Sequence, residues 1–136
     1  MTPFGRRIRE LRTERKVTQK QMAEALNVSP AWLSALEKGN RGRPSWDFVQ
    51  RVIAYFNVIW DDADELLELA HISHPRIVVD TSDLSAEATE FANLVADRIG
   101  ELQPDDLNDL IHEVKRRANQ RKSAKGEEER SSDRDE

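Results

Sequence analysis

The stretch Thr18–Gly39, TQKQMAEALNVSPAWLSALEKG, predicts two short helices joined by a tight turn. Thr18 and Gln21 have the spacing of a capping box at the start of the first helix. Asn27 suits the end of that helix, because asparagine tolerates a left-handed backbone better than other non-glycine residues. Ser29 then caps a second helix that opens with proline, where the missing N–H does no harm, and the closing glycine ends it.

Apolar residues at helical spacing give each of these helices one inward face. They are Met22, Ala23 and Leu26 in the first helix, and Leu33 and Leu36 in the second. Two helices joined by so short a turn must cross steeply, which leaves one face of the second helix, residues 30–38, free to reach outward. This is the helix-turn-helix geometry, in which the second helix reads a major groove.

The segment from about Phe4 to Ala70 resembles the phage lambda repressor/Cro-like (XRE-family) helix-turn-helix domain. The matching residues are Thr18-Gln19, Ala23 where the helices touch, Asn27 where the family usually has glycine, Val28-Ser29, Leu33, Leu36 and Glu37-Lys38-Gly39. The resemblance implies an all-α fold with a five-helix DNA-binding domain in residues 1–70.

The resemblance also implies which side chains meet DNA. Gln19 is expected to hold a phosphate and to orient base-contacting side chains. The residues expected to point into the major groove are Ser29, Pro30, Ala31 and Ser34, with Ala35 near its edge. Small and apolar side chains touch thymine methyls or hydrogen-bond singly, so specificity is expected to depend on thymine contacts, Lys38, Asn40 and DNA shape.

Three further residues extend this candidate surface. Trp32 lies next to the inward face, where core packing is favoured over contact with the sugar–phosphate backbone. Arg41 and Arg43 flank a glycine in the following loop, and loops at this position of the family lie along the DNA backbone. At least one of the two arginines is therefore expected to bind phosphate.

A helix over residues 4–15 precedes the motif, because Phe4, Ile8 and Leu11 fall at i, i+4 and i+7. Of its outward arginines, one or two are expected to contact phosphate. Arg12 is set apart, because the family resemblance implies a structural pair between Arg12 and Glu37.

Two more helices complete the predicted domain. Ser45 caps a helix whose apolar face is predicted to be Trp46, Val49, Ile53 and Phe56. Residues 60–70 form the fifth helix, opened by acidic residues that suit a helix N-terminus and lined by Leu66, Leu67 and Ala70. In the resembling family, this last helix and the loop beside it commonly form the dimer contact.

The rest of the chain divides into three parts. Residues 71–84 form a linker, in which residues 76–79 are at most a short strand and Pro75 prevents a continuing helix. Residues 85–118 form a helical hairpin whose apolar stripes pack on the first domain, on a second copy or on another protein. Residues 119–136 contain no apolar residue beyond Ala124 and are predicted to be disordered.

Charge is distributed unevenly along a chain whose net charge is −5. Residues 1–55 hold 11 Lys and Arg against 5 Asp and Glu, whereas residues 56–117 hold 5 against 15. Because attraction to phosphate is screened over about 10 Å, the local excess matters more than the total. The basic first half is therefore predicted to face DNA.

The composition and motifs of the chain exclude several classes of protein and several kinds of site. Among 136 residues there is no cysteine, which excludes disulfides and thiolate metal sites and fits a reducing cytoplasm. The sequence shows no membrane span or signal peptide. It shows no nucleophile–base spacing, glycine-rich phosphate loop or metal set, and His71, His74 and His112 are taken as ordinary histidines. Neither an enzyme nor a cofactor is predicted.

These observations predict a cytoplasmic, sequence-specific transcriptional regulator that binds double-stranded DNA, most simply a homodimeric repressor. Each copy is expected to place helix 30–38 in a major groove of an inverted-repeat operator. Two alternatives stay open. One is an antitoxin or phage-type switch protein that binds a partner protein through residues 85–118. The other is an interaction adaptor that no longer binds DNA. The small and apolar side chains on the outward face of helix 30–38 allow this alternative, whereas the basic loop that follows the helix argues against it.

Overall fold

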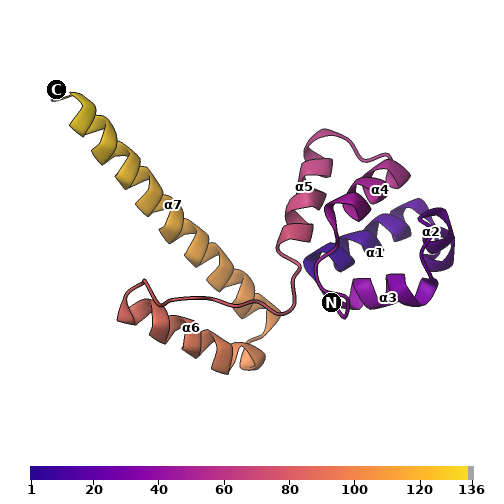
Figure 1. Ribbon diagram of the computed structural model, residues 1–136, viewed down its shortest axis with the longest axis horizontal. Coiled ribbons are helices and arrows are strands. Elements are labelled where there is room, and N and C mark those ends of the chain that lie inside the picture. The colour runs from indigo at the N-terminus through magenta and orange to yellow at the C-terminus, as the bar shows by residue number, and fades with distance from the viewer. Residues whose placement is uncertain (135–136) are drawn as a thin grey trace. The chain divides into compact units, whose positions relative to one another are not determined.

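The computed structural model describes residues 1–134 and is all-α over this range, as predicted (Figure 1). Its elements are α1 (Pro3–Arg15), α2 (Gln19–Ala25), α3 (Pro30–Lys38), α4 (Trp46–Phe56), α5 (Trp60–His71), α6 (Ala86–Arg98), the 3₁₀ turn η1 (Ile99–Glu101) and α7 (Pro104–Arg134). The chain forms two units, unit 1 (Met1–Val78) and unit 2 (Val79–Glu136). No helix among residues 1–134 is long and apolar enough to cross a membrane.

Side-chain caps begin five of these helices, and those on α2, α3 and α4 are the ones that the sequence analysis names. The Oγ1 of Thr18 accepts from the backbone N–H of Gln21, whose side chain accepts from the N–H of Thr18, so the predicted capping box is confirmed. The other caps are Thr2 on α1, Ser29 on α3, Ser45 on α4 and Ser85 on α6. Each cap satisfies a backbone donor that has no partner within the helix.

The turn between α2 and α3 depends on Asn27, which has a φ of 57°. This is the left-handed conformation predicted for the end of the first helix. The N–H of Val28 then bonds the carbonyl of Ala23 at 2.9 Å, which returns the chain towards α2. The turn is closed by backbone bonding, so α3 leaves α2 at a fixed angle.

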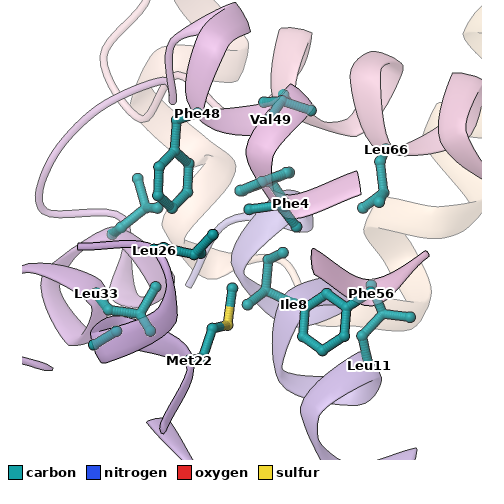
Figure 2. Close-up of a cluster of buried hydrophobic side chains, with 14 residues drawn as sticks. Phe4, Ile8, Leu11, Met22, Leu26, Leu33, Phe48, Val49, Phe56 and Leu66 are labelled. Carbon is teal, nitrogen blue, oxygen red and sulfur yellow. The ribbon is translucent and has the colours of Figure 1, made fainter. Parts of the chain in front are cut away.

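Unit 1 encloses one apolar core, to which each of its five helices contributes (Figure 2). Helix α1 packs against α3 and α5, α2 packs against α3, and α4 packs against α5. The core consists of Phe4, Ile8, Leu11, Met22, Ala23, Leu26, Leu33, Leu36, Phe48, Val49, Val52, Phe56, Leu66 and Ala70. Because α3 contributes only Leu33 and Leu36 to this cluster, the opposite side of the helix remains available to solvent.

The predicted inward face of α4 is partly wrong. Trp46 is 70% exposed, whereas Phe48 and Val52 are buried beside Val49 and Phe56. Trp46 is the first residue of the helix and lies at the edge of the buried arc. A helix covers the core through the middle of its apolar arc, so an aromatic residue at the edge of the first turn extends past it.

Ser73 joins the two ends of unit 1 and was not identified from the sequence. Its side chain is 2% exposed, its Oγ accepts from the N–H of Phe4 at 2.9 Å, and it donates to the carbonyl of Leu69. One hydroxyl thus satisfies a first-turn donor of α1 and a carbonyl of α5. The start of the chain is thereby fixed beside the last helix of the domain.

Residues 76–79 do not form the short strand that the sequence allowed. Ile77, Val78 and Val79 are between 60% and 95% exposed, and no strand occurs within residues 1–134. A strand needs a neighbouring strand to satisfy its backbone groups, and the described part of the chain offers none.

In unit 2, the prediction that residues 119–136 are disordered is wrong for residues 119–134. Helix α7 continues to Arg134, and positions 135–136 lie outside the described residues. Nine of the sixteen residues 119–134 are glutamate, lysine, arginine or alanine, and all four are strong helix formers. Pairs at i, i+3 and i, i+4 add to the helix, as between Glu113 and Arg116 or Arg117. High polarity therefore excludes a core here without excluding a helix.

Candidate nucleic-acid interface

Helix α3 presents the residues that the sequence assigns to the major groove. Ser29, Pro30 and Ala31 are exposed, and Ser34 and Ala35 are half-buried. On the opposite side, Leu33 and Leu36 are at most 2% exposed. The first turn of the helix is therefore accessible while its other face is fixed in the core.

Both ends of α3 are held in place. The Oγ of Ser29 accepts from the N–H of Trp32 at 3.0 Å. At the other end Gly39 has a φ of 87°, a left-handed conformation that glycine adopts without strain. A rigid helix is what groove reading needs, because base contacts depend on the position of each side chain.

Trp32 belongs with the core. Its ring packs edge to face on Phe48, with centroids 5.0 Å apart and planes at 66°. It is half-buried against the apolar cluster. The core interpretation of Trp32 is therefore confirmed, and its role is to connect α3 to α4.

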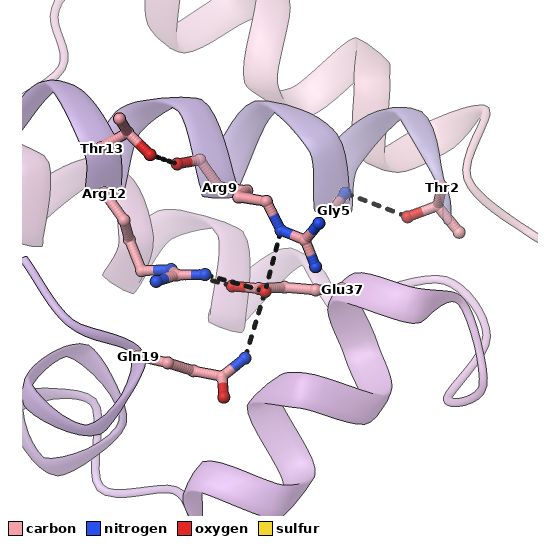
Figure 3. A network of polar contacts seen from close by, with 7 residues as sticks. All are labelled: Thr2, Gly5, Arg9, Arg12, Thr13, Gln19 and Glu37. Atoms are coloured by element: carbon pink, nitrogen blue, oxygen red, sulfur yellow. Dashed lines mark hydrogen bonds and ion pairs between the residues drawn. The ribbon is translucent and has the colours of Figure 1, made fainter.

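Glu37 anchors α3 through a polar network that is only 1% exposed at its centre (Figure 3). Arg12 donates from Nε and Nη2 to the two carboxylate oxygens of Glu37, each at 3.0 Å, so the pair implied by the resemblance is present in bidentate form. Gln19 donates from Nε2 to Oε2 at 3.2 Å, and Arg9 adds a longer ion pair at 3.9 Å. Helices α1, α2 and α3 thus meet on one buried carboxylate.

Gln19 is also part of this network. The amide that the resemblance assigns to a phosphate donates to Glu37 in the structure. An amide group has two N–H donors, so one donor remains for an external acceptor. Gln19 therefore lies where it links the buried network to the start of α2.

Gly5 allows α1 and α3 to approach closely at this point. A Cβ built on Gly5 would lie 2.2 Å from the carbonyl oxygen of Glu37 and 2.7 Å from its Cα. Such distances are shorter than any real contact, and the atoms concerned are backbone. Sequence reasoning missed this residue, although a glycine inside a predicted helix is the available signal.

The two arginines in the loop after α3 have different surroundings. Arg43 donates from Nη1 to the carbonyl of His71 at 3.4 Å and lies 3.1 Å from its Nδ1, so it is tied to the end of α5. Arg41 is exposed and makes no side-chain hydrogen bond or ion pair within residues 1–130. Lys38 and Asn40 are exposed as well. Free cationic groups therefore lie on both sides of the α3 C-terminus.

The histidines that flank the end of α5 have ordinary partners. His71 contacts Arg43, and the Nδ1 of His74 accepts from the backbone N–H of Arg76 at 3.1 Å. No cluster of three or more His, Cys, Asp or Glu residues placed to hold a metal occurs in the part of the chain that the structure describes.

Comparison with known proteins places residues 3–69 in a family described as "Helix-turn-helix domain". The chain is similar to the uncharacterized HTH-type transcriptional regulator RghRB of Bacillus subtilis, with 37% identity over 62 residues, or 46% of this chain and 45% of the relative. It is also similar to the HTH-type transcriptional repressor RghR of the same bacterium, with 48% identity over 44 residues, or 32% of this chain and 33% of the relative.

A third relative is the HTH-type transcriptional activator BcrR of Enterococcus faecalis, with 34% identity over 49% of this chain and 34% of the relative. The chain therefore matches less than half the length of each of these relatives. Among solved structures, a chain of the SinR protein/SinI protein complex aligns with 22% identity and a TM-score of 0.42, covering 85% of this chain and 98% of that chain.

The family match covers the capped α2–α3 pair, the turn at Asn27 and the core that holds them. Residues 3–69 of the chain therefore match the helix-turn-helix domain family, the kind of domain that the sequence resembles.

Proposed function

We propose that the protein is a transcriptional regulator that binds duplex DNA by placing α3 in the major groove. The observation that carries this proposal is the two-sided character of α3. Leu33, Leu36 and Glu37 fix the helix from within, while Pro30 and Ala31 are open to solvent. A groove about 12 Å wide admits a helix presented in this way.

The charge around α3 supports the same function. Lys38 and Arg41 extend from the C-terminal end of α3 and the loop that follows it, and both are exposed. Phosphate contacts fix the register of a protein on DNA and supply most of its sequence-independent affinity. Base discrimination then comes from small side chains, which touch thymine methyls, and from the shape of the duplex.

We further propose that the regulator acts as a homodimeric repressor. Two copies would place their α3 helices one helical turn apart, about 34 Å, on an inverted repeat. A dimer that occupies such an operator prevents other proteins from binding the same DNA, and this needs no catalytic step. Selection of bound duplexes from a random pool tests the proposal, and recovery of half-sites without two-fold symmetry would contradict the dimeric mode.

Ala31→Glu is expected to weaken DNA binding by about 100-fold, because it places a carboxylate against phosphates and base edges. Ala31 is exposed in the first turn of α3, so the change leaves the core intact. Fluorescence anisotropy on a selected duplex measures the loss. Ala54→Glu on α4 is the matched control, since Ala54 is also exposed and the charge change is the same. Equal affinities of the two variants would exclude α3 as the reading helix.

Arg41→Ala is expected to weaken binding uniformly over matched and scrambled duplexes. The Arg41 side chain has no hydrogen-bond or ion-pair partner within residues 1–130, so its whole charge is available to a phosphate. Removing one phosphate contact lowers the slope of log K against log salt by about 0.9. A salt titration by anisotropy measures this slope. Arg76→Ala, which removes an exposed arginine outside the helix-turn-helix, is the control and should leave the slope unchanged.

A further inference from the structure

Unit 2 leaves its large apolar side chains uncovered. Phe91 and Leu94 on α6 and Ile99 at the start of η1 are each at least 50% exposed, and Val95 on α6 is 38% exposed. No residue of α6 or η1 is buried, and the two elements contact each other but do not pack extensively on α7. Apolar surface of this extent on an amphipathic helix marks a place where another helix docks.

Helix α7 carries the complementary stripe. Leu110, Ile111 and Val114 are each about half exposed and lie on one face at i, i+1 and i+4. With Leu107, which is half-buried, they cover two turns near the start of the helix. The stripe is about as long as the one on α6, so one α6 covers one α7 stripe.

The charges beside the two stripes are opposite in sign. Glu87 and Glu90 lie on α6, one turn apart and ahead of Phe91. Lys115 and Lys122 lie on α7, seven residues and therefore two turns apart on one side of its apolar stripe. None of the four forms a hydrogen bond or ion pair within the described residues.

Two arginines next to these lysines, Arg116 and Arg117, differ from them because they have an acidic partner on α7. Glu113 accepts from Arg116 and Arg117, and these two guanidinium groups lower the pKa of Glu113 to about 2. Arg116 and Arg117 are therefore both engaged by one acidic group of their own helix. Lys115 and Lys122 are free to meet acidic groups from another helix.

We propose that α6 of one copy of this chain packs antiparallel on α7 of a second copy, and α7 of the first on α6 of the second. A register that sets Val95 against Ile111 places Glu90 at the level of Lys115. It places Glu87 less than one helical turn from Lys122. Apolar stripes and charges are then satisfied together, twice in each dimer.

A second copy is the occupant because the surface is complementary to itself in this way. Each chain contributes one acidic α6 and one α7 with free lysines, which is what a two-fold symmetric interface requires. The inference rests on the proposed function only in that an inverted-repeat operator needs two copies. Its physical argument comes from unit 2 alone.

The test uses full-length chains in sedimentation equilibrium at micromolar concentration. Wild type is expected to be dimeric, and Ile111→Asp monomeric. Glu87→Lys with Glu90→Lys makes α6 basic, and Lys115→Glu with Lys122→Glu makes α7 more acidic. Each double variant alone is expected to dimerise at least about tenfold more weakly, because four attractive pairs per dimer become repulsive.

Mixing the two double variants gives the decisive result. An equimolar mixture is expected to form heterodimers as tight as wild type, since each α6 then meets an α7 of opposite charge. If α6 closed on α7 of its own chain, mixing would restore nothing, and that outcome overturns the proposal. A wild-type chain that stays monomeric leaves the stripes to a different protein and overturns it as well.

Two controls separate this inference from the proposed function. Glu127→Lys with Glu128→Lys makes the same charge change on α7 beyond the apolar stripe and should leave the dimer unchanged. Binding of each variant to a single half-site duplex reports on α3 without requiring a dimer. A variant that no longer dimerises but still binds the half-site duplex leaves the DNA-binding proposal standing. A protein that dimerises but does not bind DNA overturns only the DNA-binding proposal.

Discussion

Replacing Glu37 by alanine is expected to lower the free energy of unfolding of unit 1 by about 3 kcal/mol. The carboxylate is 1% exposed and accepts two hydrogen bonds from Arg12, whose side chain is 14% exposed. Without Glu37 the guanidinium of Arg12 keeps its charge in a largely desolvated position, and Gln19 loses its acceptor. Removing one partner of such a pair costs more than the pair itself contributes, because the remaining charge is uncompensated.

Urea denaturation followed by circular dichroism measures this change. Glu24→Ala is the matched control, because Glu24 is exposed on α2 and has no ion pair within residues 1–130. Its effect is expected to stay within about 0.5 kcal/mol. Glu37→Gln should fall between the two, since it keeps the shape and part of the hydrogen bonding. A Glu37→Ala protein as stable as the control would show that the network does not hold α3.

Gly5→Ala is expected to destabilise unit 1 by about 3 kcal/mol, at the upper end of the range for overpacking. The added Cβ would meet the backbone of Glu37 at 2.2 Å, and backbone atoms cannot rotate out of the way as a side chain can. Helices α1 and α3 must therefore move apart, which also stretches the bonds between Arg12 and Glu37. In an open helix the same substitution stabilises by up to about 1 kcal/mol, so the expected sign is reversed here.

Gly126→Ala supplies the comparison for Gly5→Ala. Gly126 lies inside α7, and a Cβ there has nothing within 4 Å. This change is expected to leave the unfolding midpoint of unit 1 unaltered and to increase helicity slightly. Thermal unfolding of the two variants side by side makes the measurement. If Gly5→Ala matched wild type, the close approach of α1 to α3 would not be a constraint of the fold.

The helical boundaries of the motif were predictable because they depend on local chemistry. Thr18, Ser29 and Ser45 cap the helices that the sequence assigns to them, and Asn27 has the expected positive φ. A cap or a left-handed turn involves only neighbouring residues, so its pattern is visible in a short stretch. The residues of α3 that reach solvent follow from the same pattern, because its two leucines fix the inward side.

Other features depended on residues that are distant in the sequence. Ser73 bonds Phe4 across 69 positions, and Gly5 is required by the backbone of Glu37. Neither contact leaves a periodic signal. Spacing alone predicts that Trp46 lies in the core, whereas the position of α4 over the core leaves Trp46 exposed. The polarity beyond residue 118 favours disorder by composition, but polarity excludes only burial, and α7 continues to Arg134.

The sequence by itself determined the all-α class, the capped α2–α3 pair and the side of α3 that faces outward. Caps, turn residues and 3.6-residue periodicity act within one or two helical turns, so they can be interpreted without coordinates. Only the tertiary structure decided that Gln19 and Arg9 join Arg12 on Glu37 and that Arg43 is tied to His71. Those contacts arise from the angles at which helices cross, and the packing of the whole core sets these angles.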